Sequence, residues 1–255
     1  MSSNTWTPAE LSSNAQRTAG VCWRVVEAQH HVSTAKLTDT AEEQNRLEQL
    51  LEATKPSVPE ECRHHHWLLH TPFRYGAPYP NGSRFRRAGL TPGVFYAAEA
   101  PETAISEIAF SRVLFFADSP ATPWPANAGE YTTFSADYLT ARAIDLTLAP
   151  LNADRAAWIH VTDYTRCQAI ADVARGSDIE MIRYQSVRDP RRGLNLAVLT
   201  CRVFAKAEPS ARQTWRIQLS KSGARAIREF PKLVIDFDQN AFAADPRLAG
   251  MRWDR

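Results

Sequence analysis

The chain has 255 residues, of which 44% are hydrophobic and 23% are charged. These values are typical of a globular protein and argue against a disordered, collagen-like or coiled-coil chain. The length is sufficient for one large domain or two small domains with a hydrophobic core. The 30 basic and 28 acidic side chains leave a formal net charge of +2, which is weak evidence against a nucleic-acid-binding protein.

The near-neutral total conceals an asymmetry along the chain. Residues 1–180 carry 15 basic and 21 acidic side chains, a net charge of −6, whereas residues 181–255 carry 15 basic and 7 acidic side chains, a net charge of +8. The basic C-terminal third leaves a nucleic-acid-binding module open as an alternative function. The arginines that would contact phosphates in such a module are Arg188, Arg191, Arg192, Arg202, Arg212, Arg216, Arg225 and Arg228.

The cysteines and the N-terminus bear on the cellular compartment. The four cysteines are widely spaced and include no CxxC pair, so they predict neither a zinc ribbon nor a redox motif, and they do not suggest a disulfide scaffold. The N-terminus lacks the apolar core of a signal peptide, and no apolar run approaches the length of a membrane span. We therefore expect a cytoplasmic protein that has no membrane segment.

The first predicted elements form an N-terminal extension. Residues 1–20 are polar and are expected to be loosely ordered, and residues 22–26 predict a short strand. Leucines at helical spacing predict a helix over 39–54, with Asp39 as its N-cap and Glu42 three residues later.

The extension is expected to pack on a larger domain. We place the extension at residues 1–60 and the larger domain at 61–255, with the two forming one compact unit. Residues 62–93 are rich in proline and glycine and are expected to be mostly loop.

The remaining elements alternate irregularly between strands and helices. Residues 94–98 predict a strand, and residues 102–116 predict a helix with Pro101 in its first turn. Further strands are expected at 131–134, 143–148, 179–184, 196–204, 215–219 and 233–237, and a helix at 163–175. Because the strands do not follow a strict βαβ order, we predict an α+β fold with mixed, mainly antiparallel sheets flanked by helices.

A search for established site motifs is mostly negative. The chain contains no GxG pair, no Walker sequence, no GxSxG elbow and no HExxH sequence. His66 and His70 lie at helical spacing close to His64, His65 and Cys62. This cluster lacks an acidic ligand, so we interpret it as a polar surface turn and expect no metal, although a metal enzyme remains a third hypothesis.

Three segments that are far apart in the sequence form an ordered pattern. They are 71–75 with 82–85, 93–98 with Thr103, Ala104 and Glu107, and 184–188 with Asn195. An arginine after a small residue, a tyrosine at a strand end, a glutamate on the next helix and a late serine resemble the RES domain family, which is named for its Arg, Glu and Ser. The resemblance covers about residues 71–200 and, more weakly, Trp23 and Arg24. The chain departs from the pattern at Ser83, where a second glycine is usual, and at Arg86 and Arg87, where Asn or Gly is more usual.

The resemblance implies a fold and a function. RES domains are similar in fold to ADP-ribosyltransferases, and members act as toxins of bacterial toxin–antitoxin pairs. They consume NAD by hydrolysis, by phosphorolysis or by ADP-ribosyl transfer, and the sequence does not choose among these acceptors. The implied partner is a small, helical antitoxin with a DNA-binding part, which would cover the active site. Many members of the family pair, so the resemblance also implies a homodimer as one candidate state of this chain.

The resemblance also assigns candidate roles to charged residues. Glu107 would stabilise the positive charge that develops on the ribose when the nicotinamide bond breaks. Arg84 would bind the pyrophosphate or ribose of NAD, and Arg74 is a weaker second candidate for the phosphates. Without the resemblance, Glu107 reads as an ordinary helix glutamate and the arginines as solvated loop residues.

The polar candidates have comparable alternatives. Tyr96 would stack on the nicotinamide or ribose and donate a hydrogen bond, but it also fits a core aromatic residue of a strand. Ser186 would hold the nicotinamide amide or the catalytic carboxylate, but a strand-end serine often bonds its own turn. Asn195 would support the same edge of the site. Ser186 is not expected to be a nucleophile because no His–acid relay accompanies it.

Overall fold

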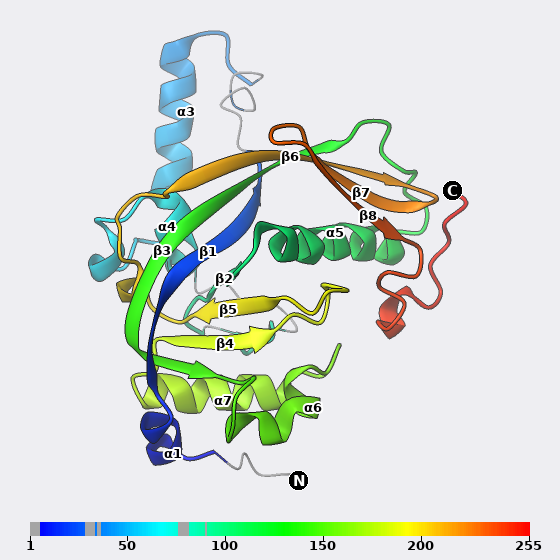
Figure 1. The fold of residues 1–255 in the computed structure, drawn as a ribbon. Helices are drawn as coiled ribbons and strands as arrows, with labels where there is room; N and C mark the ends of the chain where they lie inside the picture. The colour runs from blue at the N-terminus through cyan, green and yellow to red at the C-terminus, as the bar shows by residue number, and fades with distance from the viewer. Residues whose placement is uncertain (1–5, 29–33, 35–36, 76–81, 90) are drawn as a thin grey trace.

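The computed structural model describes residues 6–28, 34, 37–75, 82–89 and 91–255. It shows a mixed α+β architecture in which helices pack around one eight-stranded sheet (Figure 1). The predicted α+β class is therefore confirmed. The strands, in their order across the sheet, are β1 (Gln16–Glu27), β2 (Phe95–Ala98), β5 (Leu194–Val198), β4 (Met181–Gln185), β3 (Gly129–Asp145), β6 (Ala211–Ser220), β7 (Gly223–Arg228) and β8 (Leu233–Asp238).

The pairing of β1 closes part of this sheet into a ring. β1 pairs with β2 through Trp23 and Ala98, and along most of its length it also pairs with β3. The strands β1, β2, β5, β4 and β3 therefore surround one region, and β6, β7 and β8 extend the sheet beyond it. Among the described strands, β3 and β4 are parallel and the other pairs are antiparallel.

Two differences in the strands have clear physical causes. The strands predicted at 131–134 and 143–148 are one strand, β3. Its middle includes the buried polar residue Thr140, whose hydroxyl donates to Glu180 at 2.6 Å, so a distant partner satisfies a residue that interrupts the apolar pattern. Strand β7 was not predicted because its apolar residues are mainly small alanines.

The helices lie on several sides of the sheet (Figure 1). They are α1 (Pro8–Ser13), α3 (Ala41–Ala53), α4 (Trp67–Arg74), α5 (Pro101–Asp118), α6 (Arg155–Trp158) and α7 (Thr165–Gly176). The helix predicted at 102–116 is α5, and it buries an apolar face that includes Ile105, Phe110 and Val113 against β6 and β7. Proline at its first position costs no hydrogen bond, because that backbone N–H would lack a helical partner.

The N-terminal extension differs from the prediction. The described part of residues 1–20 is ordered: Thr7 and Glu10 form a capping box for α1, and Leu11 is fully buried. Helix α3 begins at Ala41 and not at residue 39, and Thr40 is its N-cap in place of Asp39, with Glu43 completing the capping box. None of its residues is buried, and α3 projects from the rest of the molecule (Figure 1).

The segment expected to be loop contains a helix and a cysteine of a disulfide. His66 accepts a hydrogen bond from the backbone N–H of Leu68 and so caps α4. Cys62, in the short 3₁₀ helix η1 (Glu60–Cys62), forms a disulfide with Cys201 of η3 (Cys201–Val203). The two cysteines are 139 residues apart in sequence, so their spacing provides no signal for the pair.

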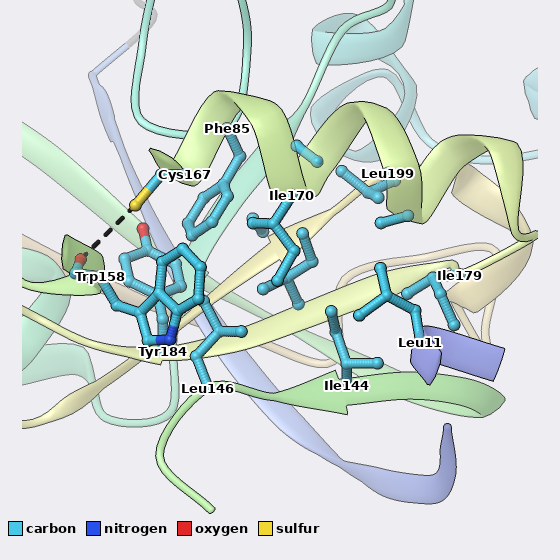
Figure 2. Packing of buried hydrophobic residues seen from close by; sticks show 14 of the residues in the cluster. Leu11, Phe85, Ile144, Leu146, Trp158, Cys167, Ile170, Ile179, Tyr184 and Leu199 are labelled. Carbon is cyan, nitrogen blue, oxygen red and sulfur yellow. Dashed lines mark hydrogen bonds between the residues drawn. The ribbon is translucent and has the colours of Figure 1, made fainter. Parts of the chain in front are cut away.

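A buried cluster beneath α7 supports one side of the ring. Figure 2 shows Phe85, Trp158, Ile170 and Tyr184 packed between α7 and the strands. The thiol of Cys167 donates to the carbonyl of Trp158 at 3.6 Å, and burial raises its pKa. This packing fixes the backbone of Trp158, which matters for the site described next.

Candidate active site

A cavity of about 520 Å³ lies beside the closed part of the sheet. Its walls come from β1, the turn at 82–84, β2, α5, the region that follows β4, and the C-terminal segment. Four predicted site residues line it: Arg84, Tyr96, Glu107 and Asn195. Ser186, the fifth, lies directly behind Glu107 and is almost fully buried. The volume of the cavity is within the usual range for small-molecule sites.

The carboxylate of Glu107 is held by two neutral donors. Ser186 donates from its hydroxyl to Oε1 of Glu107 at 2.6 Å, and Asn195 donates from its amide to the same oxygen at 2.6 Å. Among the described residues, no side chain or backbone group donates to Oε2. The carboxylate is therefore fixed through one oxygen, and the other oxygen remains for a ligand.

Ser186 itself is fixed by the turn that follows β4. Its Oγ accepts hydrogen bonds from the backbone N–H groups of Arg188 and Asp189, at 3.2 and 3.0 Å. The Ser186 hydroxyl therefore stabilises its own turn and also donates to Glu107. The turn is attached to α5 by Thr103, whose hydroxyl donates to Asp189 at 2.7 Å.

Arg84 is presented by a tight turn. Ser83 and Arg86 pair across it, and Gly82 adopts a φ of +62°, where an added Cβ would lie 2.3 Å from the carbonyl of Arg86. The guanidinium of Arg84 donates to the carbonyl of Trp158 at 2.8 Å, close to the core in Figure 2, and lies over the ring of Tyr164. These contacts hold a positive charge at the cavity wall.

Tyr96 supports this turn. Its hydroxyl accepts from the backbone N–H of Phe85 at 2.9 Å and shares a hydrogen bond with Ser83 at 2.8 Å. Burial raises the pKa of the Tyr96 phenol, so the group stays neutral. Its hydroxyl positions the turn that carries Arg84, while its side chain contributes to the cavity wall.

Arg74 does not join the other candidates. Its guanidinium donates to the carbonyl of Pro56 and pairs with Glu52 of α3 at 2.5 Å. It is not among the residues that line the cavity. The weaker of the two predicted phosphate contacts therefore ties α4 to α3, and the prediction for Arg74 is not supported by its position.

A family model described as the RES domain matches residues 58–220, which is more than half of the chain. The chain belongs to the RES domain family. Among solved structures, one that is similar is the crystal structure of the M. tuberculosis MbcT-MbcA toxin–antitoxin complex. The match has a TM-score of 0.45 and 16% identity, and it covers 82% of this chain and 92% of that chain. No curated protein matches this chain.

Residues outside the matched RES domain also line the cavity. Trp23 and Arg24 come from β1, and Arg247 comes from the C-terminal segment. Arg24 donates to the carbonyl of Tyr96 at 2.7 Å and lies over the ring of Phe95. The cavity of this RES domain protein is therefore built by three parts of the chain, and only the central part lies within the family match.

Sequence reasoning assigned Arg188 to a different role. It was grouped with possible phosphate contacts of a nucleic-acid-binding surface, but its side chain is 5% exposed and pairs with Asp245 at 2.6 Å. It also donates to the carbonyl of Val161 at 2.6 Å and lies over the ring of Phe110 at 3.9 Å. Asp245 is distant in sequence, so no local pattern indicated this pair.

Tyr184, which also lines the cavity, contributes an uncharged phenol to its wall. Burial, and then the charge of Glu107, raise the pKa of Tyr184 well above its ordinary value. Among the described residues, no group of three His, Cys, Asp or Glu side chains is arranged to hold a metal ion. His66 lies near Glu208 and Arg212 at the start of α4 and is not among the cavity residues.

Proposed function

We propose that this RES domain protein cleaves the bond between nicotinamide and ribose in NAD. The observation that carries the proposal is the fixed carboxylate of Glu107, which shares a cavity with Arg84. Ser186 and Asn195 bind one carboxylate oxygen, and the other is available to the substrate. A fixed anion and a fixed cation within one cavity match a substrate that has a cationic leaving group and a pyrophosphate.

The reaction follows from these charges. The carbon–nitrogen bond breaks, its electron pair goes to the nicotinamide nitrogen, and neutral nicotinamide leaves. The ribose then carries positive charge. The Glu107 carboxylate stabilises this charge electrostatically or by accepting a hydrogen bond from a ribose hydroxyl. Because Ser186 and Asn195 already hold the carboxylate, it does not need to reorganise as charge develops. The acceptor can be water, phosphate or a protein side chain, and all three follow the same first step.

We further propose a toxin role that is controlled by an antitoxin. A cell that contains an unregulated NAD consumer loses NAD and stops growing, so such an enzyme requires a neutralising partner. In keeping with the family, we propose a small, helical, DNA-binding antitoxin that covers the cavity, an ADP-ribosyltransferase-like core and pairing of two copies. We also propose action in the cytoplasm, where the Cys62–Cys201 pair would be reduced. The described residues form no helix of the length and apolarity that a membrane span requires.

A biochemical experiment tests the enzyme proposal. Purified protein is incubated with NAD, and released nicotinamide is quantified over time. We expect release by the wild type and a strong loss in Arg84→Ala. An Arg87→Ala variant is the matched control, because Arg87 belongs to the same loop but pairs with Asp172 and does not line the cavity. Absence of nicotinamide release by the wild type, together with absence of NAD binding, would overturn the proposal.

An experiment in cells tests the toxin role separately. Expression of the chain is induced in a bacterial host, and growth and total NAD are followed. We expect growth arrest with falling NAD, and normal growth when the gene encoded alongside it is expressed as well. Unimpaired growth with unchanged NAD would contradict the toxin role even if the purified enzyme is active.

A further inference from the structure

The C-terminal segment reaches the cavity from outside the matched RES domain. The short 3₁₀ helix η4 (Pro246–Leu248) begins at Asp245, whose side chain accepts from the backbone N–H of Arg247. Leu248 is buried in the core that contains α5, which anchors the segment. Arg247 is thereby held at the cavity wall.

The guanidinium of Arg247 is oriented by a buried carboxylate. Its Nε and Nη2 donate to the two oxygens of Asp245, at 2.9 and 2.7 Å. The Asp245 side chain is 0% exposed, whereas that of Arg247 is 38% exposed. An arginine that is already oriented loses less conformational freedom when it binds a ligand.

Arg188 and Arg247 share Asp245 but are not equivalent. Arg188 is buried and also bonds the carbonyl of Val161, so its donors are used within the protein. Both guanidiniums lie over the ring of Phe110, at 3.9 Å for Arg188 and 5.4 Å for Arg247. Arg188 therefore supports the wall, and Arg247 is the member of the pair that a ligand can reach.

The charges around the cavity leave a positive excess. The charged residues among its described lining are Glu107 and the four arginines Arg24, Arg84, Arg188 and Arg247. The four arginines carry four positive charges, and Glu107 and Asp245, which lies behind the wall, carry two negative charges. The net charge of this group is therefore +2. A dinucleotide pyrophosphate carries two negative charges, and the planar fork of arginine suits phosphate oxygens.

We propose that Arg247 is a specificity-determining residue that contacts the pyrophosphate of the substrate. This inference rests on the proposed cleavage of NAD and adds to it a contact from the C-terminal segment. Arg247 would bind the phosphates equally before and during bond cleavage, because they lie away from the reacting carbon. Its loss should therefore raise KM and leave kcat unchanged.

The test compares Arg247→Gln with Arg252→Gln. Arg252 lies in the same segment, is exposed and is not among the residues that line the cavity, so its substitution removes the same charge elsewhere. We measure kcat and KM for NAD, and the Kd of ADP-ribose, which keeps the pyrophosphate but lacks nicotinamide. We expect a roughly ten- to hundredfold rise in KM and Kd for Arg247→Gln, with no change for Arg252→Gln.

A conservative variant guards against a simple folding defect. Arg247→Lys keeps the charge but not the fork, so it should restore part of the ADP-ribose affinity. Thermal unfolding is recorded for each variant without ligand. Equal ADP-ribose affinity in wild type and Arg247→Gln, or equal losses in Arg247→Gln and Arg252→Gln, overturns the inference while leaving NAD cleavage intact. A wild type that binds neither NAD nor ADP-ribose overturns the proposed function itself.

Discussion

Two groups of arginines in this protein experience different environments. On the outer strands β6 to β8, Arg216 pairs with Glu229 at 2.6 Å and Arg225 pairs with Asp236 at 2.5 Å, and all four side chains are about half exposed or more. Around the cavity, Arg84 and Arg188 are buried and are held by carbonyl groups and aromatic rings.

The comparison shows why a charge count does not identify a function. The basic C-terminal third suggested a nucleic-acid-binding surface. Five of its eight candidate arginines pair with carboxylates: Arg188, Arg191, Arg202, Arg216 and Arg225. Paired arginines on the outside add little positive potential, whereas we propose that the inner arginines form a localised anion site. If these environments matter energetically, substitutions in the two groups should differ in their effect on stability.

The largest effect on stability is expected for Arg188→Gln. This substitution removes the 2.6 Å partner of the buried Asp245 and leaves Arg247 as its remaining ion-pair partner. Breaking a buried ion pair from one side costs up to about 3–5 kcal/mol. We expect a marked fall in the free energy of unfolding, measured by urea denaturation. A loss below about 1 kcal/mol would show that Arg188 contributes no more to stability than the exposed arginines, which would contradict the proposed difference between the two groups.

A smaller loss is expected for Ser186→Ala. The hydroxyl accepts from two backbone N–H groups and donates to Glu107, so its removal leaves buried donors unsatisfied. The cost should be about 2–3 kcal/mol, with a roughly tenfold lower kcat for nicotinamide release. Ser106→Ala is the control, because the buried Ser106 hydroxyl bonds only its own helix among the described residues and Ser106 does not line the cavity. Unchanged kcat in Ser186→Ala would remove Ser186 from the site.

The acid sensitivity of the protein should depend on Asp245. Burial alone would raise the pKa of this carboxyl, but hydrogen bonds from Arg247 and the charge of Arg188 outweigh burial and lower the pKa. A carboxylate with a lowered pKa stabilises the fold above pH about 4, and this contribution is lost as pH falls further. Unfolding at a series of pH values should show a shallower acid slope in Asp245→Asn, by at most about 1.4 kcal/mol per pH unit. Identical slopes would contradict this account.

The smallest effect is expected for Arg216→Gln on the outer strands. Exposed ion pairs contribute about 0.2–1 kcal/mol because water and salt screen them. We expect unchanged nicotinamide release and a loss of stability within that range, which should shrink further in high salt. A larger loss would show that the outer pairs are part of the structural core.

The central candidate residues could be grouped from the sequence because they follow regular elements, and the structure brings them to one cavity. Glu107 lies on a largely apolar helix that begins at Pro101, and Tyr96 and Asn195 lie on the paired strands β2 and β5. The order of these elements, together with the family resemblance, was sufficient to group the residues. The hydrogen bond from Ser186 to Glu107 then follows from the turn after β4.

The parts that were not predicted depend on contacts between distant segments. The pairs Arg188–Asp245 and Cys62–Cys201 join positions that no local pattern connects. The proposed role of Arg247 depends on packing of the C-terminal segment against α5. The position of Arg74 away from the cavity depends on its ion pair with Glu52 of α3. Such contacts are set by the packing of the whole sheet and not by periodicity or motif spacing.

The most direct test of the account is the rate at which Glu107→Gln releases nicotinamide from NAD. Glu102→Gln is its matched control, because Glu102 lies on the same helix and is not among the residues that line the cavity. If the carboxylate stabilises the positive ribose, kcat should fall by about 100- to 1000-fold in Glu107→Gln and remain unchanged in Glu102→Gln. Equal rates in the two variants would contradict the central role of Glu107.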